Sequence, residues 1–355
     1  MRTLAAAALL VALPAFAEVE GAVSAELTVG GKQLALQANF EISPILDRLW
    51  FVAGYGLLKA PDIPATDTTP KVTTTANHLL SAGVDLSPHK SWIFSLLGQF
   101  SPRSVESATI NSGAALTERL VMMTSHRSAG GVASVVFDSA GDSNFELGLD
   151  ASVGFTWNEL GRKVTFARFT LYEAPNASLF VTRPTLGASV LIAQVLTIGV
   201  RAGYTFYTPP DPLTVGKFAP QDLEALDEQL KAATERLAVD VDRARGAADA
   251  VLSRLTMFNA MSGYPYAPVR FDLKSSVKAK FSPRFALQLA WTYLRYVETQ
   301  GFGNVLALRG QFRFGGGWRA WVAVSAQLDA TVDRPSQSSD WAGTGHLTLG
   351  AEFAF

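Results

Sequence analysis

The chain ends "HLTLGAEFAF", residues 346–355, and its last ten residues place an apolar side chain at every second position. One face of this segment carries Leu347, Leu349, Ala351, Phe353 and Phe355. A period of two residues is that of an extended strand. The last residues of soluble domains usually fray in water, where a terminal aromatic side chain gains nothing. The segment therefore predicts a terminal strand with one face against an apolar environment.

The same alternation recurs through the chain. Apolar and polar residues alternate in QLALQANFEI, ELGLDASVGFTW, LTIGVRAGYTFY and FDLKSSVKAKF, at residues 33–42, 146–157, 196–207 and 271–281. These segments are about twice as long as the usual five or six residues of a strand in a soluble sheet. A tilted strand of about ten residues crosses a bilayer. The pattern therefore predicts membrane-spanning strands.

The composition excludes several classes of protein. Of the 355 residues, 48% are hydrophobic and 17% are charged, the net charge is -1, and there is no cysteine. Nucleic-acid-binding proteins carry a basic surface, so this balance argues against a nucleic-acid partner. Without cysteine the chain forms no disulfide and no thiolate metal site.

The first residues have the form of a secretory signal. Residues 1–17, MRTLAAAALLVALPAFA, combine a basic Arg2, a short apolar core and small residues before Glu18. The alternative is a membrane anchor, but the apolar run is shorter than the roughly 20 residues that a spanning helix needs. We expect cleavage after Ala17, which leaves residues 18–355 as the mature protein.

The connections between the alternating segments differ in length. Short corners are expected at the Ser-Pro pairs 43–44, 87–88 and 282–283, and at 192–196 and 314–318. Longer connections are expected at 59–71, 101–115, 208–266 and 331–340. Counted back from Phe355, the short corners all fall at one end of the sheet. Outer-membrane barrels have short periplasmic turns and long external loops.

With its signal, its long alternating strands and its terminal LTLGAEFAF, the sequence resembles Gram-negative outer-membrane β-barrels. The resemblance implies an all-β, closed antiparallel transmembrane barrel with one long helical loop insertion, in the outer membrane. It also implies contact with lipid and lipopolysaccharide, and a terminal signal, read by the barrel-assembly machinery, that comprises Leu347, Leu349, Phe353 and Phe355. The strand number is expected to be even, at 14 or 16. The open question is residues 101–144, which hold either two poorly patterned strands or one long external loop.

One segment departs from the strand pattern. Residues 220–258, within the expected extracellular loop 208–266, space their apolar residues by three and four, which predicts an amphipathic helix. A straight helix of this length spans roughly 57 Å, against an apolar barrel band about 25 Å tall. We therefore expect it either to project or to bend near Gly246 and cap the pore.

Charge suggests how this helix relates to the barrel. The strands flanking it are expected to direct bases into the lumen: Arg201, Arg270, Lys274, Lys278, Lys280, Arg309, Arg313 and Arg319. The helix itself is acidic, through Asp222, Glu224, Asp227, Glu228, Glu235, Asp240, Asp242 and Asp249. The hypothesis is that the acidic helix leans over a basic lumen and constricts it. The alternatives are a solvated loop helix and ordinary hydrated lumen charge.

Catalytic patterns are sparse. His126 and Ser128 match the His-x-Ser spacing of barrel lipid hydrolases, but MTSHRSAGG has the composition of a turn or loop. No spacing indicates a metal or another cofactor, and we expect a non-enzyme. Three functions remain: a porin-like channel for polar solutes, including anions; a scaffold or export component that docks a periplasmic or surface partner or a second copy through the helix; and a lipid hydrolase. The channel is favoured.

Overall fold

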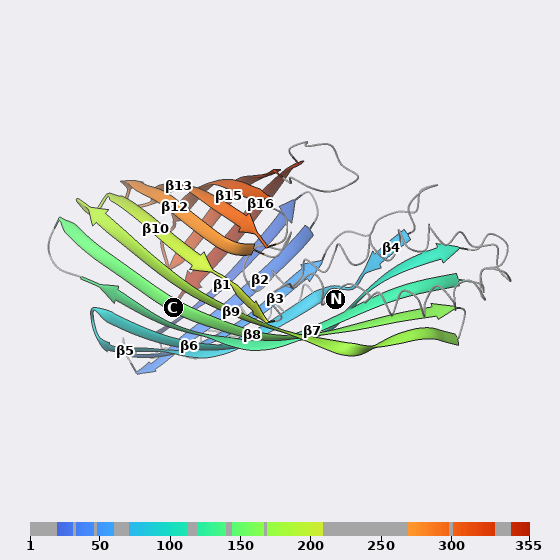
Figure 1. Ribbon diagram of the computed structural model, residues 1–355. Helices are drawn as coiled ribbons and strands as arrows, with labels where there is room; N and C mark the ends of the chain where they lie inside the picture. The colour runs from blue at the N-terminus through green and yellow to red at the C-terminus, as the bar shows by residue number, and fades with distance from the viewer. Residues whose placement is uncertain are drawn as a thin grey trace.

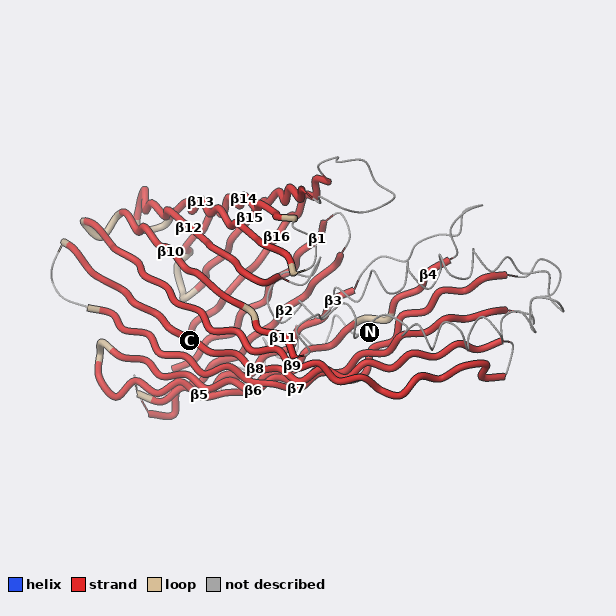
Figure 2. The backbone as a smooth tube through the Cα atoms, viewed as in Figure 1, coloured by secondary structure: helices blue, strands red, loops and turns tan. Residues whose placement is uncertain are grey.

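The structure is a computed structural model that describes residues 20–30, 33–45, 48–59, 71–111, 119–139, 144–166, 169–208, 269–297, 301–330 and 342–355. The described part is a single antiparallel β-sheet that closes on itself (Figures 1 and 2). Within it, no helix is both long enough and apolar enough to cross a membrane. The expected helix at 220–258 and the signal at 1–17 lie outside the described residues.

The sheet is built from sixteen strand segments. In chain order they are β1 (Glu20–Gly30), β2 (Gln33–Ile45), β3 (Leu49–Lys59), β4 (Lys71–Thr74), β5 (Asn77–His89), β6 (Trp92–Asn111), β7 (Arg119–Asp138), β8 (Phe145–Phe166), β9 (Phe169–Ile192), β10 (Leu196–Tyr204), β11 (Phe206–Thr208), β12 (Val269–Ser282), β13 (Phe285–Tyr296), β14 (Phe302–Arg313), β15 (Trp318–Ala330) and β16 (Ala342–Ala354).

Closure joins the first strand to the last. β1 pairs with β16 from Ala22↔Ala354 to Gly30↔His346, which seals the barrel. β4 and β5 both pair with β6 and share one position, and β10 and β11 both pair with β9. The sixteen segments therefore occupy 14 positions around the barrel. Of the two predicted counts, 14 is correct.

Within the uncertain stretch 101–144, residues 101–111 and 119–138 are strand rather than one long loop. Residues 101–111 continue β6, and β7 follows from Arg119. The predicted connection 101–115 was therefore wrong for its first eleven residues. Residues 101–111 are rich in small polar side chains, and a bulge between Ser101 and Ser104 interrupts the strand. The alternation of apolar and polar residues is therefore weak in this stretch.

The short corners lie at the end of the barrel where the start of β1 meets the end of β16. There the Gly21 amide donates to the Phe355 carbonyl at 3.0 Å. The β9–β10 turn has Ala193 and Gln194 at φ 50° and 57°, as a tight hairpin requires. At two of the three Ser-Pro sites the strand runs past the proline, to Ile45 and to His89. Each site has a register shift beside it, because proline cannot donate to the ladder.

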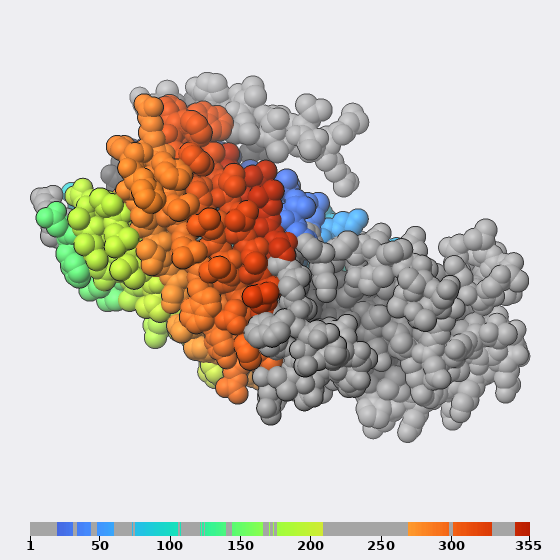
Figure 3. Space-filling model, turned by 90° about the horizontal axis from the view of Figure 1, so that it is seen from above, coloured from blue at the N-terminus to red at the C-terminus, as the bar shows by residue number. Residues whose placement is uncertain are grey.

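The outer face of the barrel is coated with large apolar side chains. On β8, Leu149, Val153 and Phe155 are 45–49% exposed, whereas Asp150 and Ser152 point to the inner face. Comparable exposed residues occur on the other long strands, including Leu347 and Leu349 of β16. Figure 3 shows the surface of β12–β16 as a continuous wall. A closed sheet with an apolar outer coat satisfies its backbone internally and can lie in hydrocarbon.

Four neighbouring strands extend past the rest of the barrel. β6–β9 are 20 to 24 residues long, and Figure 1 shows their far ends projecting beyond the barrel as a curved extension of the same sheet. We call this part the projecting sheet, comprising residues 101–111, 119–128, 158–166 and 169–179. At about 3.3 Å per residue, ten extra residues add roughly 33 Å.

The two faces of the projecting sheet exchange character relative to the barrel. Its outer face is polar, with ion pairs Arg127–Glu159 at 2.6 Å and Lys163–Glu173 at 3.1 Å. Its inner face buries the apolar side chains Leu160, Val164 and Leu179 beside the polar side chains His126, Ser128 and Asn158. The change on β8 falls just after Trp157, whose ring lies 5.4 Å from the Arg127 guanidinium. Aromatic residues of this kind mark the membrane interface, so the projecting sheet lies in water.

Candidate functional site

The candidate site is the inner wall of the barrel. In β16, His346, Thr348, Gly350 and Glu352 alternate with the exposed outer residues and therefore face the lumen. Cross-strand pairing continues this face onto the neighbouring strands. The Oγ1 atoms of Thr28 on β1 and Thr348 on β16, for example, lie 2.9 Å apart.

The structure places the sequence-predicted bases on four strands. Arg201 lies opposite Lys274, and Thr197 lies opposite Lys278, so these two lysines of β12 share the inner face with Arg201. Arg313 lies opposite Arg319. Arg270, beside a bulge in β12, places its guanidinium 5.3 Å from the Tyr207 ring and donates to the Thr205 carbonyl at 3.3 Å. The set is Arg201 on β10; Arg270, Lys274, Lys278 and Lys280 on β12; Arg309 and Arg313 on β14; and Arg319 on β15.

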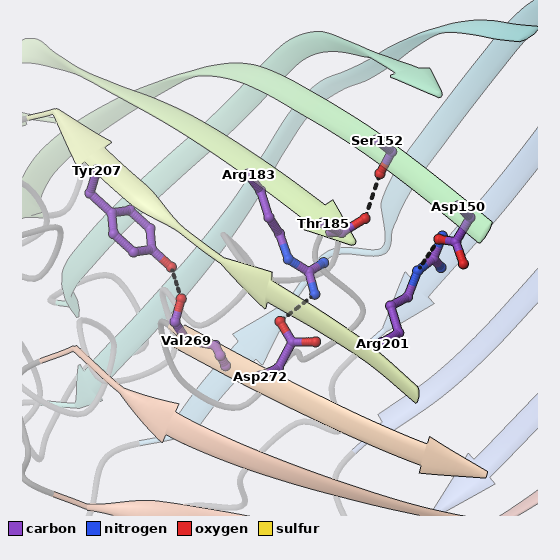
Figure 4. Close-up of polar contacts among 8 residues, drawn as sticks. All are labelled: Asp150, Ser152, Arg183, Thr185, Arg201, Tyr207, Val269 and Asp272. Carbon is purple, nitrogen blue, oxygen red and sulfur yellow. Dashed lines mark hydrogen bonds and ion pairs between the residues drawn. The ribbon is translucent and has the colours of Figure 1, made fainter. Parts of the chain in front are cut away.

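Ion pairs cross the wall between β8 and β12 (Figure 4). The Arg183 guanidinium donates to Asp272 at 2.6 Å, and the Asp272 side chain is only 5% exposed. Arg201 reaches over β9 and donates to Asp150 through Nε at 2.9 Å and through Nη2 at 2.5 Å. Two donors on one carboxylate oxygen fix the guanidinium against the wall.

A second polar group lies near the β1–β16 closure. The Trp321 indole Nε1 donates to Glu26 Oε2 at 3.0 Å, crossing Gly350. A Cβ at Gly350 would lie 2.1 Å from the Trp321 ring, so this contact requires glycine. The Arg309 guanidinium lies 4.7 Å from the centroid of the same ring. The indole therefore links an acid of one strand to a base of another.

His126 and Ser128 lie in β7, not in a turn or loop. Both are buried on the inner face, because Ser128 lies opposite Asn158 and His126 opposite Leu160. The His126 Nε2 is 3.0 Å from Asn158 Oδ1, and the Asn158 amide donates to the Leu179 carbonyl at 3.3 Å. Burial lowers the pKa of His126. Barrel lipid hydrolases work on the lipid-facing surface, whereas this pair faces inward.

Apolar residues line the inner face at the end opposite the short turns, which sequence reasoning missed. One buried cluster comprises Leu160, Leu179 and Tyr207, and another comprises Val269, Leu294 and Tyr296. The two clusters meet where the Tyr207 hydroxyl donates to the Val269 carbonyl at 2.9 Å (Figure 4). We call these six residues the inner apolar rim. A sequence signal was present for Leu160 and Leu294, because they occupy the phase that is polar elsewhere on β8 and β13. It was absent for Val269, which follows the apolar phase of β12 and reaches the inner face only through a bulge.

The remaining predicted site residues are the terminal assembly signal, which the structure describes, and the acidic residues of 220–258, which it does not. Leu347 and Leu349 lie on the outer face of β16, and the ring of Phe353 lies 4.8 Å from that of Trp318 and 6.2 Å from that of Phe355. The eight acidic residues predicted on 220–258 lie outside the described residues. Within the described ranges, no group of three or more metal-ligating side chains could hold a metal ion.

Comparison with known proteins gives distant structural likenesses only. The chain matches no protein-family model and no curated protein sequence. Solved structures similar to it include the toluene transporter TodX of Pseudomonas putida, at 8% identity over 95% of this chain and 89% of that chain, with a TM-score of 0.48. A FadL homologue of Pseudomonas aeruginosa is 9% identical over 94% and 89%, with a TM-score of 0.48. The translocator domain of the autotransporter NalP from Neisseria meningitidis is 10% identical over 99% and 94%, with a TM-score of 0.45.

Likenesses this distant say nothing about solute or activity. The class of the protein follows from its own closed sheet and apolar coat: it is a transmembrane β-barrel of the outer-membrane type.

Proposed function

We propose that the protein is an outer-membrane channel through which polar solutes, anions among them, cross the membrane. The observation that carries this proposal is the polar, charged inner wall of a closed barrel whose outer wall is apolar. A barrel of 14 strands is larger than the eight-stranded barrels whose interior side chains fill the lumen. In this proposal the bases predicted from the sequence line the wall of the pore. The short turns and both termini lie on the periplasmic side.

Biogenesis fits the same proposal. The signal at 1–17 directs export and is removed, and the barrel-assembly machinery reads Leu347, Leu349, Phe353 and Phe355 on the last strand. In the membrane the apolar coat contacts lipid and lipopolysaccharide.

We also propose that residues 220–258 form a helix that packs on the inner apolar rim and constricts the pore. Two observations support this. The connection from Thr208 to Val269 starts and ends beside Tyr207 and Val269, which both belong to the rim. The apolar stripe of 220–258 needs a partner, because packing supplies most of the stability of an amphipathic helix.

Single-channel recording tests both proposals. Refolded 18–355 is compared in planar bilayers with a variant that lacks 214–262. Steady conductance in both would establish a pore and contradict the constricting helix. Conductance that rises or appears only in the deletion variant would support the constriction. Silence from both, with folding verified by heat-modifiable migration on gels, would contradict the channel.

The second candidate is a scaffold or export component that binds a periplasmic or surface protein or a second copy. The projecting sheet favours it, because four strands extend into water with a polar outer face. Such a barrel would be silent in bilayers, which separates it from the channel. The lipid hydrolase is not supported by the inward placement of His126 and Ser128, and a lipase assay in detergent would test it.

A further inference from the structure

Charges of opposite sign occupy opposite halves of the inner wall. In the membrane-spanning part of the described chain, the inward bases belong to the run of strands from β9 to β15. Among the acids whose side chains the structure describes there, the inward ones belong to the run from β16 through β1 to β8, except Asp272, which Arg183 neutralises. We define a basic wall as Arg201, Lys274, Lys278, Arg309, Arg313 and Arg319. We define an acidic wall as Glu352, Glu26, Glu41, Asp85, Asp138 and Asp150.

Strand register places the acids on the inner face. Asp85 precedes Leu86, an outer residue that is 46% exposed, and Glu41 alternates with the outward Phe40 and Ile42. Asp138 lies opposite Gly148, two residues from Asp150, which pairs with Arg201 across the inner face. The acidic wall is therefore part of the same lumen as the basic wall.

Within each wall the charges act on one another. Lys278 is within electrostatic range of Arg309, Arg313 and Arg319. Glu41 is similarly close to Asp85 and Glu352. Like charges repel, and such clusters are costly unless water or a bound solute compensates them.

The two walls meet at two boundaries, and an ion pair joins them at each. Arg319 of β15 contacts Glu352 of β16 at 3.2 Å. On the far side of the barrel Arg201 contacts Asp150, as Figure 4 shows. Each ion pair compensates charge at its boundary, and the charges between the boundaries face the lumen.

A lumen divided in this way carries an electric field across the pore rather than along it. Low-dielectric walls of the barrel focus such a field. At physiological ionic strength the screening length is about 8 Å, so the field reaches into a narrow lumen. A singly charged solute is attracted by one wall and repelled by the other. A solute with separated positive and negative groups can align with both.

We propose that the lumen favours zwitterionic solutes, with an ammonium or guanidinium group directed to the acidic wall and a carboxylate or phosphate group to the basic wall. The proposal rests on the proposed channel and names its solute class. The basic residues alone would favour anions, and the acidic wall changes that preference.

The flux test uses one solute and its singly charged derivatives. Vesicles holding 18–355 take up radiolabelled γ-aminobutyrate, its N-acetyl derivative as an anion and its methyl ester as a cation. The zwitterion is expected to enter severalfold faster than either derivative at low salt, and this advantage is expected to fall at about 1 M salt, where screening shortens to about 3 Å. Entry of the anion faster than the zwitterion would overturn the proposal.

The second measurement is the reversal potential in a potassium chloride gradient. The wild-type protein is expected to discriminate weakly between the two ions. Glu41→Gln with Asp85→Asn should make the pore anion-selective, and Lys278→Gln with Arg313→Gln should make it cation-selective. Strong anion selectivity of the wild type, unchanged by the acidic-wall variant, would overturn the divided lumen while leaving the channel intact. Absence of conductance in folded wild-type protein would overturn the channel itself and, with it, this proposal.

Discussion

Asp272 and Arg183 form the most deeply buried ion pair among the described residues, with side chains 5% and 21% exposed. Removing one partner of such a pair leaves a buried charge uncompensated. We predict that Asp272→Ala lowers the free energy of unfolding by about 3–5 kcal/mol, as measured by urea titration of the protein refolded into vesicles. The double variant Asp272→Ala/Arg183→Met should recover most of this loss.

The exposed pair Arg127–Glu159 provides the control for that experiment. The Arg127 side chain is 47% exposed, and pairs of this kind contribute about 0–1 kcal/mol. Arg127→Ala should therefore change the stability little. An equal loss from Arg127→Ala and Asp272→Ala would contradict the special role of the buried pair.

Two glycines in the turn between β14 and β15, Gly316 and Gly317, have positive φ, and Gly317 also lies against the backbone of β16. Gly317 has φ +79°, and a Cβ there would lie 2.1 Å from the Ala354 carbonyl oxygen. We predict that Gly317→Ala costs about 1–3 kcal/mol of unfolding free energy, measured by the same urea titration. Gly315, with nothing near its Cβ position, is the matched control. A Gly315→Ala loss as large as that of Gly317→Ala would contradict a specific requirement for glycine at position 317.

Single residues also show where sequence reasoning stopped. It identified bases such as Arg201 and Lys274 because they interrupt clear apolar alternation. It did not group Glu41, Asp85 and Glu352, because these acids are far apart in the chain and only barrel closure brings their strands into one half of the wall. It also read MTSHRSAGG as a loop from its small residues, although cross-strand pairing holds the segment in β7.

At the scale of the element, strands with a regular alternation were predictable and strands that change character were not. β16 and β10 keep one apolar face throughout, and their phase was clear from the sequence. β8 changes its pattern after Trp157, since its outer face leaves lipid for water while its inner face gains the buried apolar residues Leu160 and Val164 beside Asn158 and Arg162. The alternation of apolar and polar residues is not continuous across such a change. The full length of β6–β9 was therefore not predicted from the sequence.

This change in pattern predicts where the projecting sheet is stabilised. Leu160 is 1% exposed on its inner face. We predict that Leu160→Ala, which removes a buried side chain worth about 2–5 kcal/mol, accelerates amide hydrogen exchange in residues 119–128 and 158–166. Exchange in the membrane-spanning residues 145–157 should not change.

Lys163 on the outer face of the same strand is the control. It pairs with Glu173 with both side chains exposed, so Lys163→Ala should leave exchange nearly as it is. Equal acceleration by the two variants, or acceleration that spreads through 145–157, would contradict a sheet that packs through its inner face.

At the scale of the whole molecule, the closed barrel could be predicted from the sequence, but the number of strands could not. Hydrocarbon leaves no partner for an open sheet edge, so long alternating strands imply a barrel. The choice between 14 and 16 strands depended on residues 101–144, where bulges and small residues weaken the pattern. The arrangement of charged side chains around the lumen depends on which strands face one another in the closed barrel, and no local sequence pattern contains that information.

The central claim is that alternate residues of one strand meet water in the lumen and lipid outside. The most direct test is thiol labelling of Thr348→Cys and Leu349→Cys, because the chain has no cysteine of its own. Each variant is folded into vesicles and treated with a charged, membrane-impermeant maleimide. We predict rapid labelling of Thr348→Cys and protection of Leu349→Cys. Protection of both, or labelling of Leu349→Cys alone, would contradict a water-filled barrel with its apolar face in the membrane.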